Sequence, residues 1–221
     1  MINQNLRTLY YWLTGFFMRL SGWFYRAFRA PRNGLLKVQL GPGKRNYLPG
    51  WVNVDANILT AKIDVWADLR NPLPFHDNSI DALYSHHVIE HLPNMPAHLR
   101  EAFRCLKPGG IYRLGGPNGD SAIRKYLEGD LTWFSDFPDK RRSIGGRMEN
   151  FIFCRQEHLT ILTFSYLEEL LSDAGFTNIR LCLPTRETGS PLFQDCLALE
   201  HENDFACPHT LIVEAEKPQK R

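Results

Sequence analysis

From Leu35 onward, short β-rich apolar runs alternate with helix-like segments, and no other feature of the chain limits its fold as strongly. The runs typical of strands are residues 35–40, 51–56, 62–69, 80–87, 111–116, 177–184 and 210–216. Residues 95–110 and 163–176 are predicted to be helices, the first closed by Pro-Gly-Gly and the second by Gly175. Strands that alternate with helices indicate a mostly parallel sheet covered on both faces. We therefore predict an α/β fold with a seven-stranded sheet of this kind.

Composition divides the chain into two parts. Its 221 residues, with a hydrophobic fraction of 43%, suit one domain with an appendage. Residues 1–33 carry five arginines and no acidic residue, whereas the remainder is mildly acidic. We predict a basic amphipathic helix in residues 1–33 and a main domain in residues 34–221. Within that domain, residues 118–157 are irregular and follow the fifth strand, where open α/β sheets bind ligands, so we interpret them as a substrate cap; the alternative is an ordinary surface loop.

The charge and the cysteine content argue against several classes of protein. The net charge is only +2 and the main domain has no basic stripe, so we predict no nucleic-acid partner. The five cysteines are odd in number and form no CxxC pair, which argues against a disulfide framework and against a zinc knuckle. A reducing cytoplasm is the location that this pattern predicts.

The amino-terminal segment is strongly two-sided. On a helix its large apolar residues share one side, and these are Leu9, Leu13, Phe16, Phe17, Leu20, Trp23, Phe24, Ala27 and Phe28. Glycines and arginines share the other side, namely Gly15, Arg19, Gly22, Arg26 and Arg29. Arg19 at mid-span argues against a transmembrane helix, and the lack of a small-x-small cleavage site argues against a signal peptide. We predict that residues 7–30 lie at the inner face of a membrane, with packing on the protein's own body or on a second copy as the alternatives.

The stretch "LGPGKRNYLPGWVNVD" predicts a nucleoside-type ligand. Gly41 and Gly43 follow the first strand and let the backbone approach a ligand, while Asp55 can accept two hydrogen bonds from a ribose diol. A dinucleotide fingerprint would have a third glycine at Asn46 and then a helix, but Pro49-Gly50 leaves no room for one. Without a helix amino terminus there is no pyrophosphate site, which argues against a nicotinamide dehydrogenase. The alternative is a plain tight turn.

Five ordered segments resemble the class I S-adenosylmethionine-dependent methyltransferases of the "methyltransferase type 11" kind. They are "VQLGPG", "VNVDA", "ADLRNPLPFHDNSIDALYSHHVIEHL", "LKPGGIYRLGGPN" and "YLEELLSDAGFTNI". The resemblance implies a Rossmann-like fold with helices on both faces and S-adenosyl-L-methionine as the cofactor. It also implies that the methionine part lies at Gly41, Pro42 and Gly43, the ribose at Asp55, the adenine at Asp68 and Leu69, and the sulfonium beside Ser85 and His86.

Two residues depart from the pattern of that family. Gln39 stands in the first strand where an acidic residue is usual, and Arg45 replaces the third glycine of the loop. These departures predict weaker cofactor binding than is usual in the family. They also leave open a second hypothesis, in which the protein binds the cofactor without catalysis and serves as a scaffold or partner.

The run "HHVIEH" contains the H-x-x-E-H pattern of inverted zinc proteases, with His87 and His91 around Glu90. These residues leave a strand rather than lie within a helix, and Pro93 and Pro96 shorten any helix that follows. We therefore predict no metal site. The family resemblance accounts for the run more simply.

Methylation of a hydroxyl requires removal of its proton, and histidine is the commonest side chain for that task near neutral pH. His87 is the first candidate base, followed by His91 and His158, and Asp120 is a further candidate base or acceptor ligand. Local packing or capping is the alternative role for each of them.

We predict an S-adenosylmethionine-dependent methyltransferase that acts on a small-molecule or lipid-linked saccharide acceptor, at oxygen. The basic and aromatic amino-terminal helix motivates the membrane-proximal acceptor. Homo-oligomerisation stays open.

Overall fold

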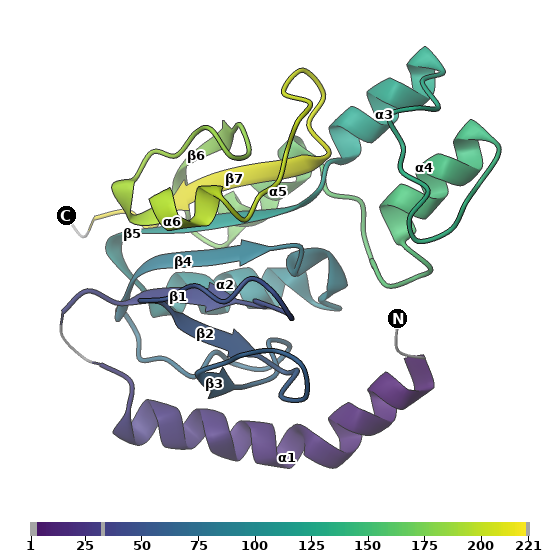
Figure 1. Ribbon diagram of the computed structural model, residues 1–221. Helices are drawn as coiled ribbons and strands as arrows, with labels where there is room; N and C mark the ends of the chain where they lie inside the picture. Colours follow the sequence, from purple (N-terminus) through teal and green to yellow (C-terminus); the bar gives the residue numbers. More distant parts are fainter. Residues whose placement is uncertain (1–3, 32–33, 220–221) are drawn as a thin grey trace.

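The computed structural model describes residues 4–31 and 34–219, which form a sheet with helices on both sides (Figure 1). Seven strands pair in the order β3-β2-β1-β4-β5-β7-β6, and only β7 is antiparallel to its neighbours. The prediction of a mostly parallel seven-stranded α/β sheet is confirmed. The strands are β1 (Lys37–Leu40), β2 (Val52–Asp55), β3 (Val65–Trp66), β4 (Ile80–His86), β5 (Leu106–Pro117), β6 (Thr177–Cys182) and β7 (Thr210–Glu216).

The larger part of the core lies between the sheet and two helices. These are α2 (Met95–Cys105) and α5 (Phe164–Asp173). Leu99 of α2 and Leu171 of α5 are fully buried in the same apolar cluster as Val38 of β1. Full burial of a leucine contributes about 1.5–3 kcal/mol, so this face holds much of the stability. The α-helices are α1 (Gln4–Phe28), α2 (Met95–Cys105), α3 (Gly119–Glu128), α4 (Ile144–Phe153), α5 (Phe164–Asp173) and α6 (Gln194–Leu197), and the short 3-10 helices are η1 (Ile89–His91) and η2 (Pro191–Phe193).

The opposite face is covered by a segment from late in the chain. No helix joins β1 to β2, as the Pro-Gly pair between them predicts. Phe193 of η2 instead packs on Trp51, with 6.0 Å between ring centroids, and Asp195 of α6 accepts a hydrogen bond from Lys37 of β1 at 3.1 Å. These residues fill the space where a helix between the first two strands would otherwise lie.

The helix predicted for residues 95–110 is shorter in the structure than in the prediction. α2 stops at Cys105, and Leu106 already pairs with Ile80 as the first residue of β5. Gly109 has a φ of +78°, and a Cβ on Gly110 would lie 3.0 Å from the carbonyl oxygen of Ile80. The Pro-Gly-Gly motif therefore builds an irregular strand start as well as a helix end, and the prediction of helix over residues 106–110 was wrong.

Residues 118–157 contain two helices that the irregular sequence pattern did not predict. Asn118 caps α3 and Ser143 caps α4, each by accepting a hydrogen bond from a backbone N–H in the first turn. The two helices lie beyond the end of β5 (Figure 1) and share a small core that includes Ala122 of α3 and Ile152 of α4.

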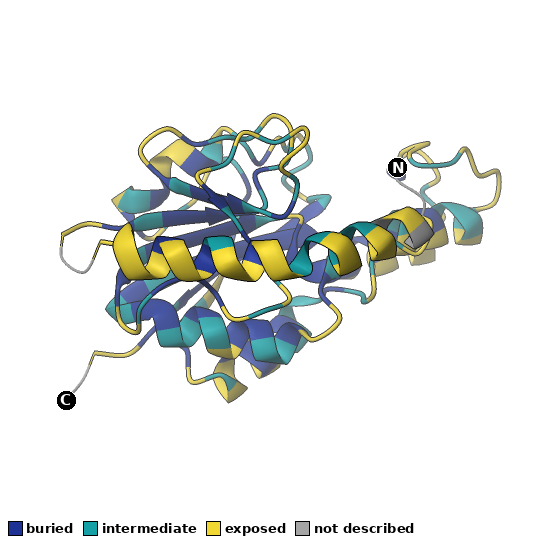
Figure 2. Cartoon of the chain, turned by 90° about the horizontal axis from the view of Figure 1, so that it is seen from below, coloured by how far each residue is buried: buried dark blue, intermediate teal, exposed yellow. Residues whose placement is uncertain are grey.

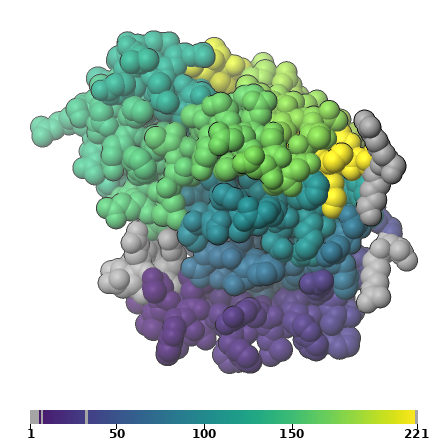
Figure 3. All heavy atoms as spheres, turned by 180° about the vertical axis from the view of Figure 1, so that it is seen from behind, coloured from purple at the N-terminus to yellow at the C-terminus, as the bar shows by residue number. Residues whose placement is uncertain are grey.

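The helix α1 packs on the domain through the side opposite to its large apolar residues. Met18, Gly22 and Tyr25 are buried, the Tyr25 ring meets Phe75 at 5.6 Å, and a Cβ on Gly22 would lie 3.2 Å from Pro74. The outer side is largely exposed (Figure 2), and it forms one whole edge of the molecule (Figure 3). Nine large apolar side chains there are 48–78% exposed, namely Leu9, Trp12, Leu13, Phe16, Phe17, Leu20, Trp23, Phe24 and Phe28.

None of the helices within residues 4–31 and 34–219 has the length and hydropathy of a membrane span. The predicted boundary between residues 33 and 34 falls at the edge of the described residues, because residues 32–33 lie outside them.

Candidate functional site

A cleft of about 590 Å³ lies at the carboxyl ends of the parallel strands, and we call it the strand-end cleft. Its lining comes from the segments that follow β1, β2, β3 and β4, together with one residue of α1 and two residues after α4, Glu157 and Leu159. In an open α/β sheet this edge is where ligands bind. Residues that define the cleft are Tyr11, Gly41, Gly43, Asp55, Asp68, Leu69, Arg70, His87, His91 and Glu157.

The turn after β1 has a backbone conformation that favours glycine. Gly41 and Gly43 have φ values of +66° and +55°, in the left-handed region. A Cβ on Gly41 would lie 2.4 Å from Cγ2 of Val88, so no larger residue fits there. A Cβ on Gly43 would meet no atom within 4 Å, so the backbone at this position faces open space.

Asp55 is held in a fixed orientation beside that turn. One carboxylate oxygen accepts the N–H of Gly43 at 3.0 Å, and the other accepts the N–H of Asn57 at 2.9 Å. Each oxygen of an ionised carboxylate can accept a second hydrogen bond. Asp55 is half-buried and lines the cleft, so it can still receive the two hydroxyls of a ribose.

Asp68 is engaged by a neighbour that the sequence reasoning missed. Arg70 donates to both of its carboxylate oxygens, with Nε at 2.9 Å from one and Nη2 at 2.8 Å from the other. The hydrogen bond with Asp68 raises the pKa of Arg70. The guanidinium also lies 3.6 Å from the ring centroid of Tyr11, so α1 supports this side of the cleft. Because Asp68 already accepts several hydrogen bonds, it has little capacity left for an adenine amino group.

A second cavity of about 570 Å³ adjoins the strand-end cleft, and we call it the α4 pocket. It lies between the end of β5, the start of β7 and the segment around α4. The two cavities share His87, His91 and Glu157. The rest of its lining includes Pro117, Ser135, Phe137, Pro138, Asn150, Phe151, Cys154, His158, His209 and Thr210.

His87 stands at the junction of the two cavities in an unusual backbone conformation. Its φ is +55°, which a non-glycine residue adopts at a cost of about 1–3 kcal/mol, and such residues cluster at functional sites. Its Nδ1 lies 3.2 Å from an oxygen of Glu90, and its Nε2 lies 3.5 Å from the hydroxyl of Thr210. The Glu90 carboxylate thus orients the ring.

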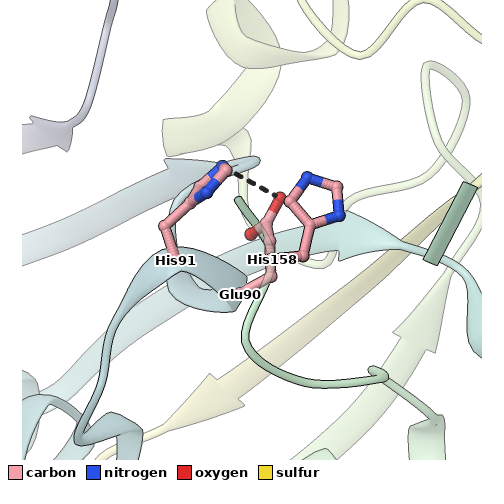
Figure 4. A group of neighbouring side chains, drawn as sticks. All are labelled: Glu90, His91 and His158. Carbon is pink, nitrogen blue, oxygen red and sulfur yellow. Dashed lines mark ion pairs between the residues drawn. The ribbon is translucent and has the colours of Figure 1, made fainter. Parts of the chain in front are cut away.

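Glu90 is fully buried, and Figure 4 shows its carboxylate between the rings of His91 and His158. Burial opposes ionisation, but the hydrogen bond from His87 and the nearby His91 lower the pKa of Glu90 below its usual value. Burial lowers the pKa of His158 below its usual value, which favours the neutral imidazole. In this group of three side chains, the ionised carboxylate of Glu90 therefore lies beside the imidazole rings of His91 and His158.

Three predicted cofactor residues do not line the strand-end cleft. Pro42 is buried beneath the glycine turn, and Ser85 is buried with its hydroxyl 2.9 Å from that of Tyr112. His86 stacks on Tyr84, and burial lowers the pKa of His86 well below its usual value. The other five, Gly41, Gly43, Asp55, Asp68 and Leu69, all line it.

Asp120 lies outside both cavities. It is exposed, and its carboxylate accepts the N–H of Phe164, the first residue of α5, at 2.8 Å. A capping role accounts for this contact. The predicted bases His87 and His91 line both cavities, and His158 lines the α4 pocket.

Comparison with known proteins agrees with this architecture. Residues 53–114 match the family described as a methyltransferase domain. A curated protein of Mycolicibacterium smegmatis, described as a probable S-adenosylmethionine-dependent methyltransferase, is 41% identical over 57 residues, which are 26% of this chain and 22% of that protein. The chain thus spans about a fifth of the length of this relative.

Two solved structures share the fold over most of the chain. One is a methyltransferase of Thermotoga maritima, described as a possible histamine N-methyltransferase, with 19% identity and a TM-score of 0.53 over 96% of this chain and 95% of that one. The other is phosphoethanolamine N-methyltransferase 2 of Haemonchus contortus, solved with S-adenosyl-L-methionine, with 17% identity and a TM-score of 0.51 over 89% of this chain and 51% of that one. The chain therefore has the fold of S-adenosylmethionine-dependent methyltransferases, and its residues 53–114 match the methyltransferase domain family.

S-adenosylmethionine is the cofactor of that family, and the strand-end cleft suits it. The backbone is open at Gly43, and Asp55 is oriented beside it for a ribose. The lining carries the carboxylates of Asp55, Asp68 and Glu157 but a single guanidinium, so it favours a cationic sulfonium over a polyphosphate.

Proposed function

We propose that the chain transfers a methyl group from S-adenosylmethionine in the strand-end cleft to an oxygen of an acceptor in the α4 pocket. The observation that carries the proposal is the junction of the two cavities at His87, His91 and Glu157. A displacement reaction needs nucleophile, carbon and leaving group in line, and positioning of this kind can supply about 7–11 kcal/mol at best. Two adjoining cavities that meet at a candidate base suit such an alignment.

His87 is the proposed general base. With Nδ1–H donated to Glu90, Nε2 carries the lone pair, and an acceptor hydroxyl that replaces its 3.5 Å contact with the Thr210 hydroxyl can give its proton to it. The buried carboxylate then stabilises the protonated ring, as the third group does in other base-activated sites. When bound, the cofactor would supply the methyl group from its sulfonium sulfur and leave as the neutral thioether S-adenosylhomocysteine.

Glu157 and the predicted cofactor residues Asp55 and Leu69 are proposed to hold the cofactor, with Arg70 and Tyr11 added from the structure. Asp68, the remaining predicted residue of this region, is proposed to act by holding Arg70 in place. Arg70 and Tyr11 form the far wall of the cleft, where a flat adenine can pack against a guanidinium and a ring. The α3–α4 segment within residues 118–157 is the proposed substrate cap, because Phe137, Phe151 and Cys154 of that segment line the α4 pocket.

Two features support the proposed acceptor class, namely the outer side of α1 and the lining of the α4 pocket. Phe137, Pro138 and Phe151 give the pocket an apolar wall, and the outer side of α1 exposes aromatic residues such as Trp12 and Trp23. A helix that exposes this side suits the membrane interface, where aromatic rings sit at the headgroup level. A lipid-linked saccharide at the inner face of a membrane is therefore the proposed acceptor, and a small soluble hydroxyl compound is the second choice.

Point variants on α1 test the membrane contact better than deletion of the helix, because Tyr11 also lines the strand-end cleft. The triple variant Trp12→Ser, Phe16→Ser, Trp23→Ser should lose most of its co-sedimentation with vesicles of phosphatidylcholine and phosphatidylglycerol. The matched control is Leu59→Ser, Leu127→Ser, Leu181→Ser, which removes exposed apolar residues elsewhere and should bind vesicles like the unmodified protein. Equal sedimentation of both triple variants would refute the membrane contact.

The activity itself is tested in two stages. Calorimetry with S-adenosylmethionine and S-adenosylhomocysteine should detect binding of both. Incubation with methyl-labelled cofactor and a bacterial membrane extract should then transfer label to an extractable lipid or saccharide. Binding without transfer to any acceptor would instead favour the scaffold hypothesis, in which the buried Gln39 replaces the usual acidic residue.

A further inference from the structure

The segment that carries His158 is tied to η1 by two contacts. The backbone N–H of Leu159 donates to the carbonyl oxygen of Glu90 at 2.8 Å, and Nδ1 of His91 lies 2.8 Å from the carbonyl oxygen of Glu157. These contacts flank His158 and bring its ring to 4.8 Å from that of His91, measured between centroids. The two contacts thereby hold η1 beside a segment that follows it by 66 or more positions in the chain.

Both imidazoles are held in the same tautomer by backbone carbonyls. Nδ1 of His91 meets Glu157, and Nδ1 of His158 lies 2.8 Å from the carbonyl oxygen of Ile152. A carbonyl can only accept, so each Nδ1 carries the proton and each Nε2 keeps its lone pair. Histidines that bind metals show this arrangement, with the second ring nitrogen donating to a carbonyl or carboxylate.

Glu90 supplies the third group. Its Oε1 lies 3.8 Å from Nε2 of His91, while its Oε2 is buried and has no hydrogen-bond partner among the described residues. Gly116 leaves room for this oxygen, because a Cβ there would lie 3.0 Å from it. A buried carboxylate oxygen without a partner costs free energy unless something else satisfies it.

We propose that Glu90, His91 and His158 form a binding site for a divalent transition metal ion such as Zn²⁺. Their ligand atoms lie within 4.8 Å of one another. Ligands of a tetrahedral zinc ion lie about 3.3 Å apart at Zn–N distances of about 2.0–2.1 Å, so small side-chain rotations complete the site. Two histidines and one carboxylate with an open position are a donor set of catalytic zinc and iron sites.

This site differs from the one that the H-x-x-E-H pattern suggests. The pattern would pair His87 with His91 on a helix, and η1 is too short for that, as the sequence analysis argued. His158 takes the place of His87, which keeps its contacts with the Thr210 hydroxyl and with Oε1 of Glu90. No local sequence pattern pairs His158 with Glu90 and His91, because His158 comes from a distant segment of the chain.

The position of the proposed metal site beside the α4 pocket indicates a role for the ion in binding the acceptor. His91 and His158 line the α4 pocket, so an open coordination position can hold an acceptor hydroxyl or carboxylate there. This role rests on the proposed methyl transfer, whereas metal binding itself does not.

Equilibrium dialysis of the full chain against Zn²⁺, with metal content measured by mass spectrometry, tests the site. The protein should retain one equivalent. His91→Ala and His158→Ala should each weaken retention by more than the roughly 10–100-fold that loss of an outer partner costs. His201→Ala removes an exposed histidine outside the group and should retain zinc like the unmodified protein.

A measurement on the unmodified protein guards against variants that fail to fold. Co²⁺ should give visible absorption bands of a low-coordinate site, which vanish when one equivalent of Zn²⁺ is added. Absence of retained zinc and of cobalt bands, or equal losses in His201→Ala and His158→Ala, would overturn the metal site. Cofactor binding by calorimetry reports separately on the proposed function, so the two can fail independently.

Discussion

The strand-end cleft and the α4 pocket adjoin each other, but the chain builds them in different ways. The cleft is made of polar and backbone groups at the ends of strands, and nearly all of them fall between residues 41 and 93. The α4 pocket combines the ends of β5 and β7 with the α4 segment, so its lining spans residues 87 to 210. We propose that the strand-end cleft recognises the cofactor through fixed hydrogen bonds, and that the side chains of the α4 segment determine which acceptor the α4 pocket takes.

Substitution of His87, at the junction of the two cavities, should lower the rate of methyl transfer much more than the affinity for the cofactor. His87→Ala removes the proposed base, so kcat for methyl transfer should fall by about 10²–10⁴-fold. The affinity for S-adenosylhomocysteine, measured by calorimetry, should stay within about twofold, because Asp55 and the glycine turn are unchanged. His201→Ala is the control for loss of a histidine. A variant that keeps full activity would remove His87 from the mechanism.

Asp55→Ala tests the polar side of the comparison. A hydrogen bond to a charged group contributes about 1.5–3 kcal/mol, and two ribose hydroxyls are proposed to lose theirs, so affinity for S-adenosylhomocysteine should fall by at least about 100-fold. Calorimetry measures the change, with Asp173→Ala at the exposed end of α5 as the matched control. Unaltered affinity in Asp55→Ala would mean that the ribose lies elsewhere.

A thiol label tests whether the α4 pocket is separate. Cys154 lines that pocket and is half-buried, whereas the other four cysteines are buried. Burial raises the pKa of the Cys154 thiol, so a bulky maleimide is added at mildly alkaline pH. Labelled protein should lose methyl transfer by about tenfold or more through steric exclusion of the acceptor, with cofactor affinity unchanged. Cys154→Ser treated in the same way is the control, and equal loss of cofactor binding would show that the cavities are not independent.

The smallest effect is expected where α1 meets the cleft. Tyr11→Ala removes the ring under the Arg70 guanidinium, a contact of about 0.5–1 kcal/mol, so cofactor affinity should fall by about two- to fivefold. Tyr126→Ala, an exposed tyrosine of α3, should leave the affinity unchanged in the same calorimetric titration. A loss as large as that of Asp55→Ala would make α1 a principal part of the cofactor site.

The same contrast explains how far the sequence could predict the molecule. The glycine turn and Asp55 were accessible because a strand end, a positive φ and a carboxylate leave local traces in "LGPGKRNYLPGWVNVD". Arg70 was missed although it stands two residues after Asp68, because nothing local says that its guanidinium turns back.

Long-range placement was beyond the sequence. His158 reaches Glu90 through the contacts of Leu159 and Glu157 with η1, and the irregular run before it hid both α3 and α4. The side of α1 that packs on the domain was also not predictable. Its two sides were visible from periodicity, but which of them meets the domain depends on the close approach of Gly22 to Pro74.

A crystal structure with S-adenosylhomocysteine bound tests the central claim most directly, namely that a cofactor cleft and an acceptor pocket meet at His87. The ribose hydroxyls should lie on the Asp55 carboxylate, the backbone of Gly43 should face the ligand, and the sulfur should point toward the α4 pocket beside His87. Ligand bound away from Asp55, or a sulfur directed away from the α4 pocket, would contradict the account.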